Sequence, residues 1–229
     1  MTTDFTPRLD VLPPPQRRLW DELVAVPEEF VLYGDTALAL HLGHRQSVDF
    51  DFFGNQPLDP ALLAPAVAFL AGAIVTQRAL NTFSCMVDRG GVIQLSFFGL
   101  PDLPRPLPPL IAPDNGLRVA SLLDLAGTKA SVVQVRAEAQ DYLDIDALLT
   151  DGRIDLTTAL AAARAIYETP FNPQNTLKVL SYFEDGNLRR LPPAVRDRLA
   201  AAARRVDLDR LPVIAAAGRG GDDASGGSR

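Results

Sequence analysis

Hydrophobic residues recur with two different spacings along the chain, and the change between them separates a strand-rich from a helix-rich region. In the first region, short apolar or alternating runs predict strands at residues 30–33, 48–53, 74–80, 83–88 and 92–98. Arg89, Gly90 and Gly91 are expected to turn the last two strands into an antiparallel hairpin beside the strand at 48–53.

Apolar residues at helical spacing predict helices at 16–26, 60–71, 121–136, 137–149, 156–168, 174–183 and 194–205. The inner face of the first helix is expected to carry Leu19, Trp20, Leu23 and Val24. Residues 101–113 contain six prolines interleaved with apolar residues, so they predict an extended crossover between the two regions.

The stretch from residue 30 to 53 holds the strongest candidate chemistry. Gly34 permits a sharp turn after the first strand, and the N-terminus of the short helix that follows can bind a phosphate. Asp49 and Asp51 share one face of the next strand, because side chains alternate with a period of two. Paired carboxylates favour Mg²⁺. The alternative is a charged strand edge that discourages aggregation.

A second group of charged residues lies in the helix-rich region. Lys129 is a positively charged residue within two and a half apolar turns of a predicted helix, so its ammonium group needs a carboxylate or a ligand phosphate as partner. Asp141 and Asp144 share a helical face by their spacing, and Arg136 precedes them. We expect Lys129 to face Asp49 and Asp51 across a cleft; a purely structural salt-bridge network is an equally weighted alternative.

Composition narrows the class of protein. A chain of 229 residues with net charge −6 fits one domain, or one with a helical extension, and general attraction to nucleic acid is not expected. The single cysteine and the absence of a long apolar run favour a soluble cytoplasmic protein without disulfides. Between residues 188 and 210 seven arginines accumulate, which indicates a solvated helix face or, less commonly, an RNA contact. His41 and His44 lack a third zinc ligand at a suitable spacing.

Residues 33–40 (YGDTALAL) and 43–53 (GHRQSVDFDFF) resemble the signature of the AbiEii/AbiGii-type nucleotidyltransferase toxin family. Lys129, Arg136 and residues 141–144 (DYLD) are similar to the helical motif of that family. The resemblance implies an α+β fold of the DNA polymerase β-like nucleotidyltransferase superfamily, with a mixed sheet flanked by helices and a helical C-terminal part. We accordingly divide the chain into an arm and helix (1–27), a nucleotidyltransferase core (28–113), a helical part (114–217) and a disordered tail (218–229).

The resemblance also implies a function. An Mg²⁺-dependent enzyme would transfer a nucleotide from a nucleoside triphosphate to an acceptor hydroxyl, often on tRNA, and a cognate antitoxin would restrain it; no membrane is implicated. The implied roles are metal ligands (Asp49 and Asp51), a phosphate-binding turn (Gly34 and Thr36, with Asp35 between them among the nucleotide-binding positions), supports of the turn or phosphate (Arg45 and Ser47), a triphosphate clamp (Lys129) and its surroundings (Arg136, Asp141 and Asp144).

Two positions differ from the pattern of the family or its superfamily. Asp35 stands where the family usually has a second glycine, and as a helix N-cap it would occupy the N–H groups that bind phosphate. Gln94 and Ser96 occupy the strand face on which many relatives place a third carboxylate. A non-catalytic module that binds a nucleotide or a partner and retains the fold is therefore the alternative.

Overall fold

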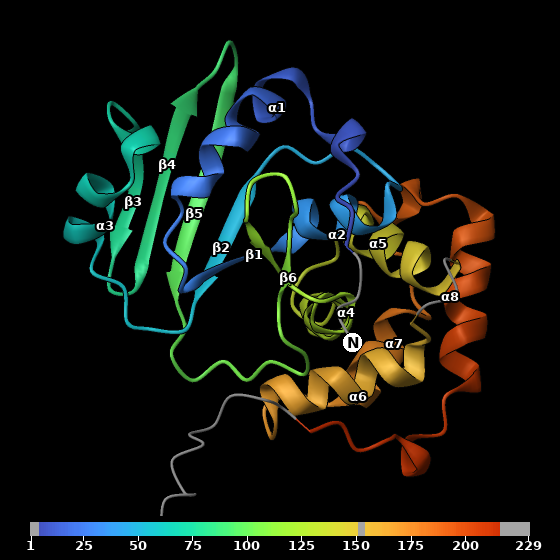
Figure 1. Cartoon of the computed structure of the whole chain (residues 1–229). Helices are drawn as coiled ribbons and strands as arrows, with labels where there is room; N and C mark the ends of the chain where they lie inside the picture. Colours follow the sequence, from blue (N-terminus) through green and yellow to red (C-terminus); the bar gives the residue numbers. More distant parts are fainter. Residues whose placement is uncertain (1–4, 151–153, 216–229) are drawn as a thin grey trace, which may run out of the picture.

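The computed structural model describes residues 5–150 and 154–215, and these form a mixed sheet with a helical part beside it (Figure 1). The predicted tail at 218–229 lies outside the described residues. The sheet has the strand order β3-β4-β5-β2-β1-β7-β6. Its strands are β1 (Phe30–Tyr33), β2 (Phe50–Gly54), β3 (Ile74–Ala79), β4 (Thr82–Asp88), β5 (Val92–Gly99), β6 (Leu110–Ile111) and β7 (Arg118–Val119).

The centre of the sheet shows why these segments are strands. β4 and β5 form the predicted antiparallel hairpin, and β5 then pairs in parallel with β2, which runs antiparallel to β1. On one face Phe50, Phe52 and Phe97 are fully buried, and the rings of Phe52 and Phe97 stack 4.9 Å apart. The opposite face carries Asp51 and Ser96, which occupy paired positions.

The helices follow the predicted pattern with local breaks. They are α1 (Pro14–Trp20), α2 (Gly34–Leu42), α3 (Pro60–Ala66), α4 (Leu122–Val132), α5 (Ala139–Thr150), α6 (Leu156–Tyr167), α7 (Pro173–Val179) and α8 (Pro193–Arg205). The helix expected at 16–26 continues past α1 only as the 3-10 helix Asp21–Ala25. Its predicted inner residue Val24 is 66% exposed, so that assignment is wrong. The helix expected at 60–71 ends at Ala66, one residue after Pro65, which lacks the N–H that a helix interior requires, and continues only as the 3-10 helix Ala68–Leu70.

The strand expected at 48–53 begins later than its pattern suggests. β2 starts at Phe50, so Asp49 immediately precedes the strand, and Val48 is 51% exposed. The backbone carbonyls of these two residues accept hydrogen bonds from side chains: Gln16 donates to Val48, 2.8 Å away, and Thr36 donates to Asp49. Side chains therefore take the place of a neighbouring strand at this end.

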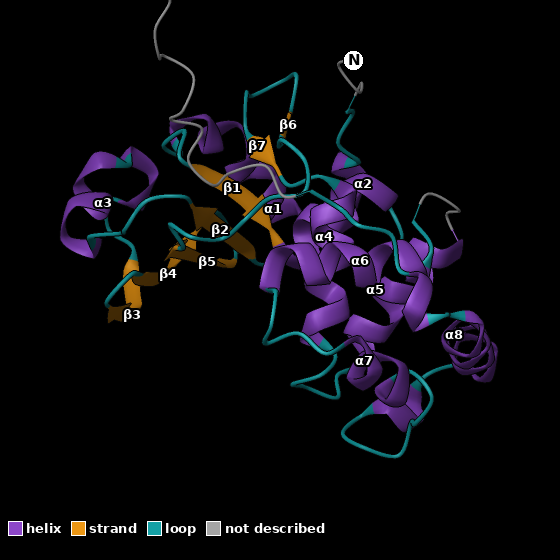
Figure 2. Cartoon of the chain, turned by 90° about the horizontal axis from the view of Figure 1, so that it is seen from below, coloured by secondary structure: helices purple, strands orange, loops and turns teal. Residues whose placement is uncertain are grey.

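The helical part lies to one side of the sheet, next to β1, while β3, β4 and β5 extend away from it (Figure 2). α4 packs closely on α6 because Gly127 lets the helices approach: a Cβ at Gly127 would lie 2.9 Å from the backbone nitrogen of Ala163. β7 joins the sheet in parallel with β1, so the sheet extends past residue 113. Among the described residues, no helix is both long and apolar enough to cross a membrane.

Candidate active site

The turn between β1 and α2 brings the two central aspartates to a helix N-terminus. Gly34 has a φ of 70°, which favours glycine, and a Cβ at this position would lie 2.9 Å from Oδ2 of Asp51. The N-cap of α2 is Tyr33, which provides no side-chain hydrogen bond. The expectation that Asp35 caps the helix is therefore wrong, and within residues 5–150 and 154–215 no side chain is found to cap the N–H groups of the first turn.

Asp49 and Asp51 are held in their neutral forms more readily than ordinary aspartates. Burial, together with the charges of Asp49 and Asp35, raises the pKa of Asp51 to about 6. Burial and the charge of Asp35 also raise the pKa of Asp49. Ser96 hydrogen-bonds Asp51 and opposes this effect. Neither aspartate forms a salt bridge with any residue in the described ranges, and the charge of Lys129 only partly opposes the rise in the pKa of Asp51.

The other predicted charged residues form one buried network around Lys129. The Nζ atom of Lys129 contacts Asp35, lies 2.7 Å from Oδ1 of Asp141 and lies 2.6 Å from Oδ2 of Asp144. Burial opposes protonation, but the three carboxylates raise the pKa of Lys129 to about 12. Lys129 thus has the carboxylate partners that its position in an apolar helix requires.

Two arginines complete this network and connect its helices. Arg45, which follows α2, binds Asp144 through two hydrogen bonds of 2.6 and 2.9 Å, and it also contacts Asp35 at 2.8 Å. Arg136 binds Asp141 in the same bidentate way, at 2.6 and 2.9 Å. Three arginine and lysine side chains therefore balance the three carboxylates. The network joins α2 to α4 and α5.

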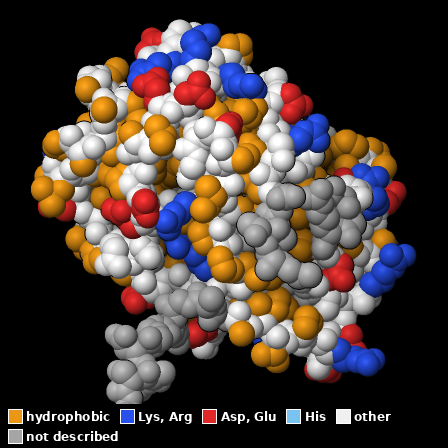
Figure 3. Space-filling model, in the orientation of Figure 1, with side chains coloured by type: hydrophobic (Ala, Val, Ile, Leu, Met, Phe, Trp, Pro, Cys, Tyr) orange, Lys and Arg blue, Asp and Glu red, His pale blue; other side chains and the backbone are white. Residues whose placement is uncertain are grey.

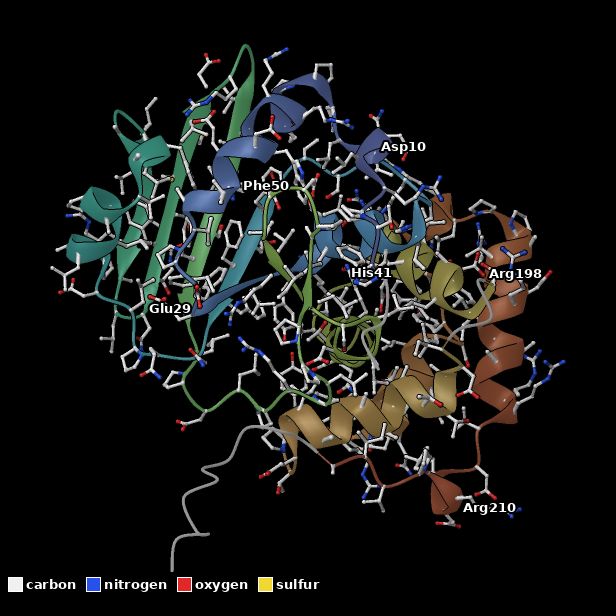
Figure 4. The ribbon with its side chains drawn as sticks, in the orientation of Figure 1. Asp10, Glu29, His41, Phe50, Arg198 and Arg210 are labelled. Carbon is white, nitrogen blue, oxygen red and sulfur yellow. The ribbon has the colours of Figure 1, made fainter. Side chains whose placement is uncertain are left out.

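The two histidines near α2 have separate partners. Nε2 of His44 lies 2.7 Å from Oδ1 of Asp144, whereas His41 hydrogen-bonds the carbonyl of Ala120 at 2.9 Å. His41 is labelled in Figure 4, where it lies between the sheet and the helical part. The link from His44 to Asp144 has no counterpart in the sequence motifs, because 100 residues separate the two.

Thr36 and Ser47 support the loop that carries Asp49. The hydroxyl of Thr36 lies 2.8 Å from the hydroxyl of Ser47 and also contacts the carbonyl of Asp49. Both side chains are buried. Thr36 and Ser47 therefore fix the position of Asp49 relative to the first turn of α2.

Two groups of carboxylates could attract a cation. Oxygen atoms of Asp35, Asp141 and Asp144 lie within 4.8 Å of one another, but the ammonium of Lys129 contacts all three. Asp49 and Asp51 form no salt bridge within the described residues. Burial, followed by the charge of nearby aspartates, raises the pKa of each. Hard oxygen ligands next to a free helix N-terminus suit a divalent ion that also contacts phosphate. Asp49 and Asp51 therefore fit Mg²⁺ better than Asp35, Asp141 and Asp144 do.

Residues without a predicted role also lie at the site. The hydroxyl of Tyr33 donates to Oδ1 of Asp124, 3.2 Å away, and the ring of Tyr33 stacks on Phe53 with centroids 4.6 Å apart. Arg105, from the proline-rich crossover, donates to the carbonyl of Phe53 at 3.1 Å. The alternation of β2 could have placed Phe53 on the face of Asp51; no sequence pattern indicates the contact with Arg105.

The arginine-rich segment at 188–210 lies largely on α8, away from the sheet (Figure 1). Arg198, labelled in Figure 4, binds Asp146 at 2.6 and 2.8 Å, and Arg189 binds Glu184 at 2.9 Å. On the face shown in Figure 3, basic and acidic side chains are interspersed among hydrophobic ones. Part of the basic charge is therefore compensated within the protein.

Comparisons with known proteins identify the family and the fold. The sequence model of the family described as "Nucleotidyl transferase AbiEii toxin, Type IV TA system" matches residues 17–216. An uncharacterized protein of Aquifex aeolicus is 28% identical over 176 residues, which cover 74% of this chain and 82% of that protein.

Two solved structures share the fold. A crystal structure from H. pylori, assigned as a nucleotidyltransferase, has a TM-score of 0.50 and 18% identity, covering 82% of this chain and 89% of that one. MenT4, a nucleotidyltransferase toxin from Mycobacterium tuberculosis, has a TM-score of 0.54 and 15% identity, with 83% of each chain covered.

Proposed function

The chain belongs to the AbiEii nucleotidyltransferase toxin family and is thus a nucleotidyltransferase. We propose that it transfers a nucleotide to a hydroxyl of RNA. The expected acceptor is tRNA, and the expected cofactor is Mg²⁺. The position of Asp51 is the main support for this proposal. Its Oδ2 lies beside Gly34 at the N-terminus of α2, where the N-cap residue Tyr33 provides no side-chain hydrogen bond. A triphosphate at this N-terminus would lie beside both aspartates.

In the proposed reaction, the acceptor oxygen forms a bond to the α-phosphorus as the bond to the bridging oxygen breaks. Pyrophosphate leaves with that electron pair, and the hydroxyl proton passes to water. Mg²⁺, when bound, would neutralise charge that develops on the phosphates. Asp49 and Asp51 would hold the ion, while the N–H groups of α2 would bind the departing phosphates. Thr36 and Ser47 keep Asp49 in place.

Lys129 can serve as a triphosphate clamp if a phosphate replaces one of its carboxylate partners. The side chains of Asp141 and Asp144 are fully buried, whereas that of Asp35 is 29% exposed. Asp35 is therefore the exchangeable partner. In this proposal Asp141 and Asp144 orient Lys129, and Arg136 and Arg45 hold those two carboxylates in turn.

The test is the transfer of label from α-labelled nucleoside triphosphates to total tRNA in the presence of Mg²⁺. We expect Asp51→Ala to reduce transfer by about 10³-fold, since metal-assisted charge stabilisation is worth several kcal/mol. Asp59→Ala is the matched control, because Asp59 only caps α3. Transfer that persists in Asp51→Ala would refute the proposal.

The alternative function is that of a module that binds a nucleotide or partner without catalysis. The presence of Ser96 opposite Asp51, where many relatives carry a third carboxylate, favours it. Triphosphate binding without release of pyrophosphate, with both RNA and protein offered as acceptors, would decide for this alternative.

The family description names a toxin-antitoxin system, and we propose a cognate antitoxin as partner and the cytoplasm as the site of action. A neighbouring gene for a small helix-turn-helix protein would support the pairing. Growth arrest on expression of the chain, relieved by that neighbour, is the direct test.

A further inference from the structure

Two aromatic side chains next to Asp51 have no role in the chemistry described above. Phe53 follows Asp51 by two residues on β2 and therefore shares its face of the sheet. Phe98 of β5 is its cross-strand partner, as Ser96 is the partner of Asp51. Both rings are partly exposed, and they meet edge to face with centroids 5.6 Å apart.

The aromatic pair lies on the opposite side of Asp51 from the helix N-terminus. β1 and β2 are antiparallel and Tyr33 pairs with Asp51, so the chain continues from Tyr33 into α2 on the side of Asp49. Phe53 pairs with Val31, further back along β1. The order along this face is therefore α2 with Asp49, then Asp51, then Phe53 with Phe98.

This order has a consequence for the direction of attack. In phosphoryl and nucleotidyl transfer the attacking and leaving oxygens lie roughly in line on either side of the phosphorus. If the phosphates that leave are bound at the N-terminus of α2, the acceptor hydroxyl approaches from the far side of Asp51. That is the side of Phe53 and Phe98.

We propose that Phe53 and Phe98 form a stacking site for a nucleobase of the RNA acceptor, close to the nucleotide whose hydroxyl attacks. The inference rests on the proposed function, because it assumes transfer to RNA. Partly exposed aromatic rings bind unpaired bases by stacking, and single-stranded ends of RNA offer such bases. The site selects an acceptor with an unpaired end and tolerates different bases, since every base has a π-face.

The surroundings of Phe53 hold it rigidly. Besides Phe98, the ring of Phe53 contacts the buried ring of Tyr33, which stacks on it at an interplanar angle of 14°. Its carbonyl accepts a hydrogen bond from Arg105, 3.1 Å away, which ties the crossover to the end of β2. Because Phe53 has these structural contacts, Phe98 is the better position for a test.

The experiment compares Phe98→Leu with Phe98→Tyr in the full chain. Leucine keeps apolar volume without a ring, and tyrosine keeps the ring. We expect Phe98→Leu to raise KM for tRNA about tenfold, in line with the loss of one stacked base, with KM for the nucleoside triphosphate unchanged. Phe98→Tyr should retain the wild-type KM for tRNA. Tyr182→Leu, an aromatic 52% exposed on another part of the surface, is the control.

A second measurement does not depend on transfer. Binding of a labelled single-stranded RNA oligonucleotide should weaken about tenfold in Phe98→Leu. Unchanged binding and unchanged KM for tRNA would overturn the stacking site. An equal rise in KM for the triphosphate would assign the rings to the donor base and also overturn it. If the wild type transfers nothing yet Phe98→Leu weakens RNA binding, the proposed function fails and the stacking site stands.

Discussion

Among single residues, Asp51 has the property most open to measurement, because burial and the charges of Asp49 and Asp35 raise its pKa to about 6. An acid with a higher pKa in the folded than in the unfolded chain stabilises the fold most below its unfolded pKa. For Asp51 this contribution is fully present below about pH 4 and is lost as the pH rises through 6.

We therefore expect the free energy of unfolding to decrease less between pH 4 and pH 7 in Asp51→Asn than in the wild type. At pH 7, without divalent metal, the variant should exceed the wild type in free energy of unfolding by about 1–2 kcal/mol, since one pKa unit corresponds to about 1.4 kcal/mol and partial exposure reduces the effect. Urea unfolding followed by the fluorescence of Trp20 measures the difference. Parallel pH profiles for the two proteins would contradict the assignment of the raised pKa to Asp51.

Asp35 is the residue at which substrate and protein compete for the same cations. Its carboxylate binds Lys129 and Arg45. Both of these side chains also bind Asp144, so each keeps a carboxylate partner when Asp35 is replaced. We expect Asp35→Asn to bind nucleoside triphosphates about three- to tenfold more tightly, because removal of a like charge about 4 Å away is worth about 1 kcal/mol when water screens it fully. Calorimetric titration tests this, with Asp59→Asn as control. Weaker binding would mean that Asp35 positions the two cations for phosphate.

Among the elements, the turn into α2 depends on glycine for two reasons that can be separated. Gly34 and Gly72 have similar φ angles, 70° and 78°, but a Cβ at Gly34 would approach Asp51 whereas a Cβ at Gly72 would meet no atom within 4 Å. Both Gly→Ala variants should lose about 1–2 kcal/mol of unfolding free energy from the left-handed backbone.

Only Gly34→Ala should lose more than that, together with triphosphate binding, because the methyl group displaces the carboxylate of Asp51. Thermal unfolding and nucleotide titration of the two variants provide the comparison. If both variants lose the same free energy of unfolding and both still bind the triphosphate, then Asp51 moves away from the new methyl group without effect.

The longer elements were predictable from local pattern. The strand at 30–33 follows its continuous apolar run, the hairpin at 82–99 follows its strand-like segments and glycine turn, and α4 begins after its N-cap Ser121. No local pattern predicts the two-residue strands β6 and β7, because β7 forms through its pairing with β1 and β6 through its pairing with β7. The start of β2 was displaced for a similar reason, since side chains of Gln16 and Thr36 come from other elements.

The site shows the same division between local and distant information. The motifs placed Asp49, Asp51 and Gly34 together, and Lys129 was correctly expected to have a carboxylate partner. The choice of Asp35 as one of those partners depends on how α4 packs against α2, across 94 residues of sequence. Periodicity shows which face of a helix is buried but not which helix it meets. The roles of these residues in binding phosphate and metal stay predictions.

For the molecule as a whole, the buried network makes the sheet and the helical part a single unit. Arg45 after α2 and Lys129 on α4 both bind Asp144 on α5, and their contacts are buried or half-buried. Breaking such a network by removal of one partner costs about 3–5 kcal/mol. Separate unfolding of the two parts would break it, so we expect one cooperative transition.

Two probes test this prediction. Trp20 lies in the region packed on the sheet and donates to Asp114, whereas far-ultraviolet circular dichroism reports mainly the helical part. Their urea transitions should coincide, and Asp144→Ala should lower both midpoints together. A circular dichroism transition separate from that of Trp20 would show that the parts unfold independently.

The same network also constrains when the enzyme can become active during its synthesis. Arg45 and Asp144 are separated by 99 residues, and the ribosome releases the chain from its N-terminus. The sheet can begin to form as soon as β5 has emerged, but Lys129 and Arg45 lack their shared buried carboxylate until α5 follows. A nascent chain that ends before α5 therefore has the aspartate pair, but its Lys129 and Arg45 are not yet held by Asp144. Under the proposed function, a chain whose synthesis has not reached α5 would therefore transfer no nucleotide, and activity would begin only after α5 has folded.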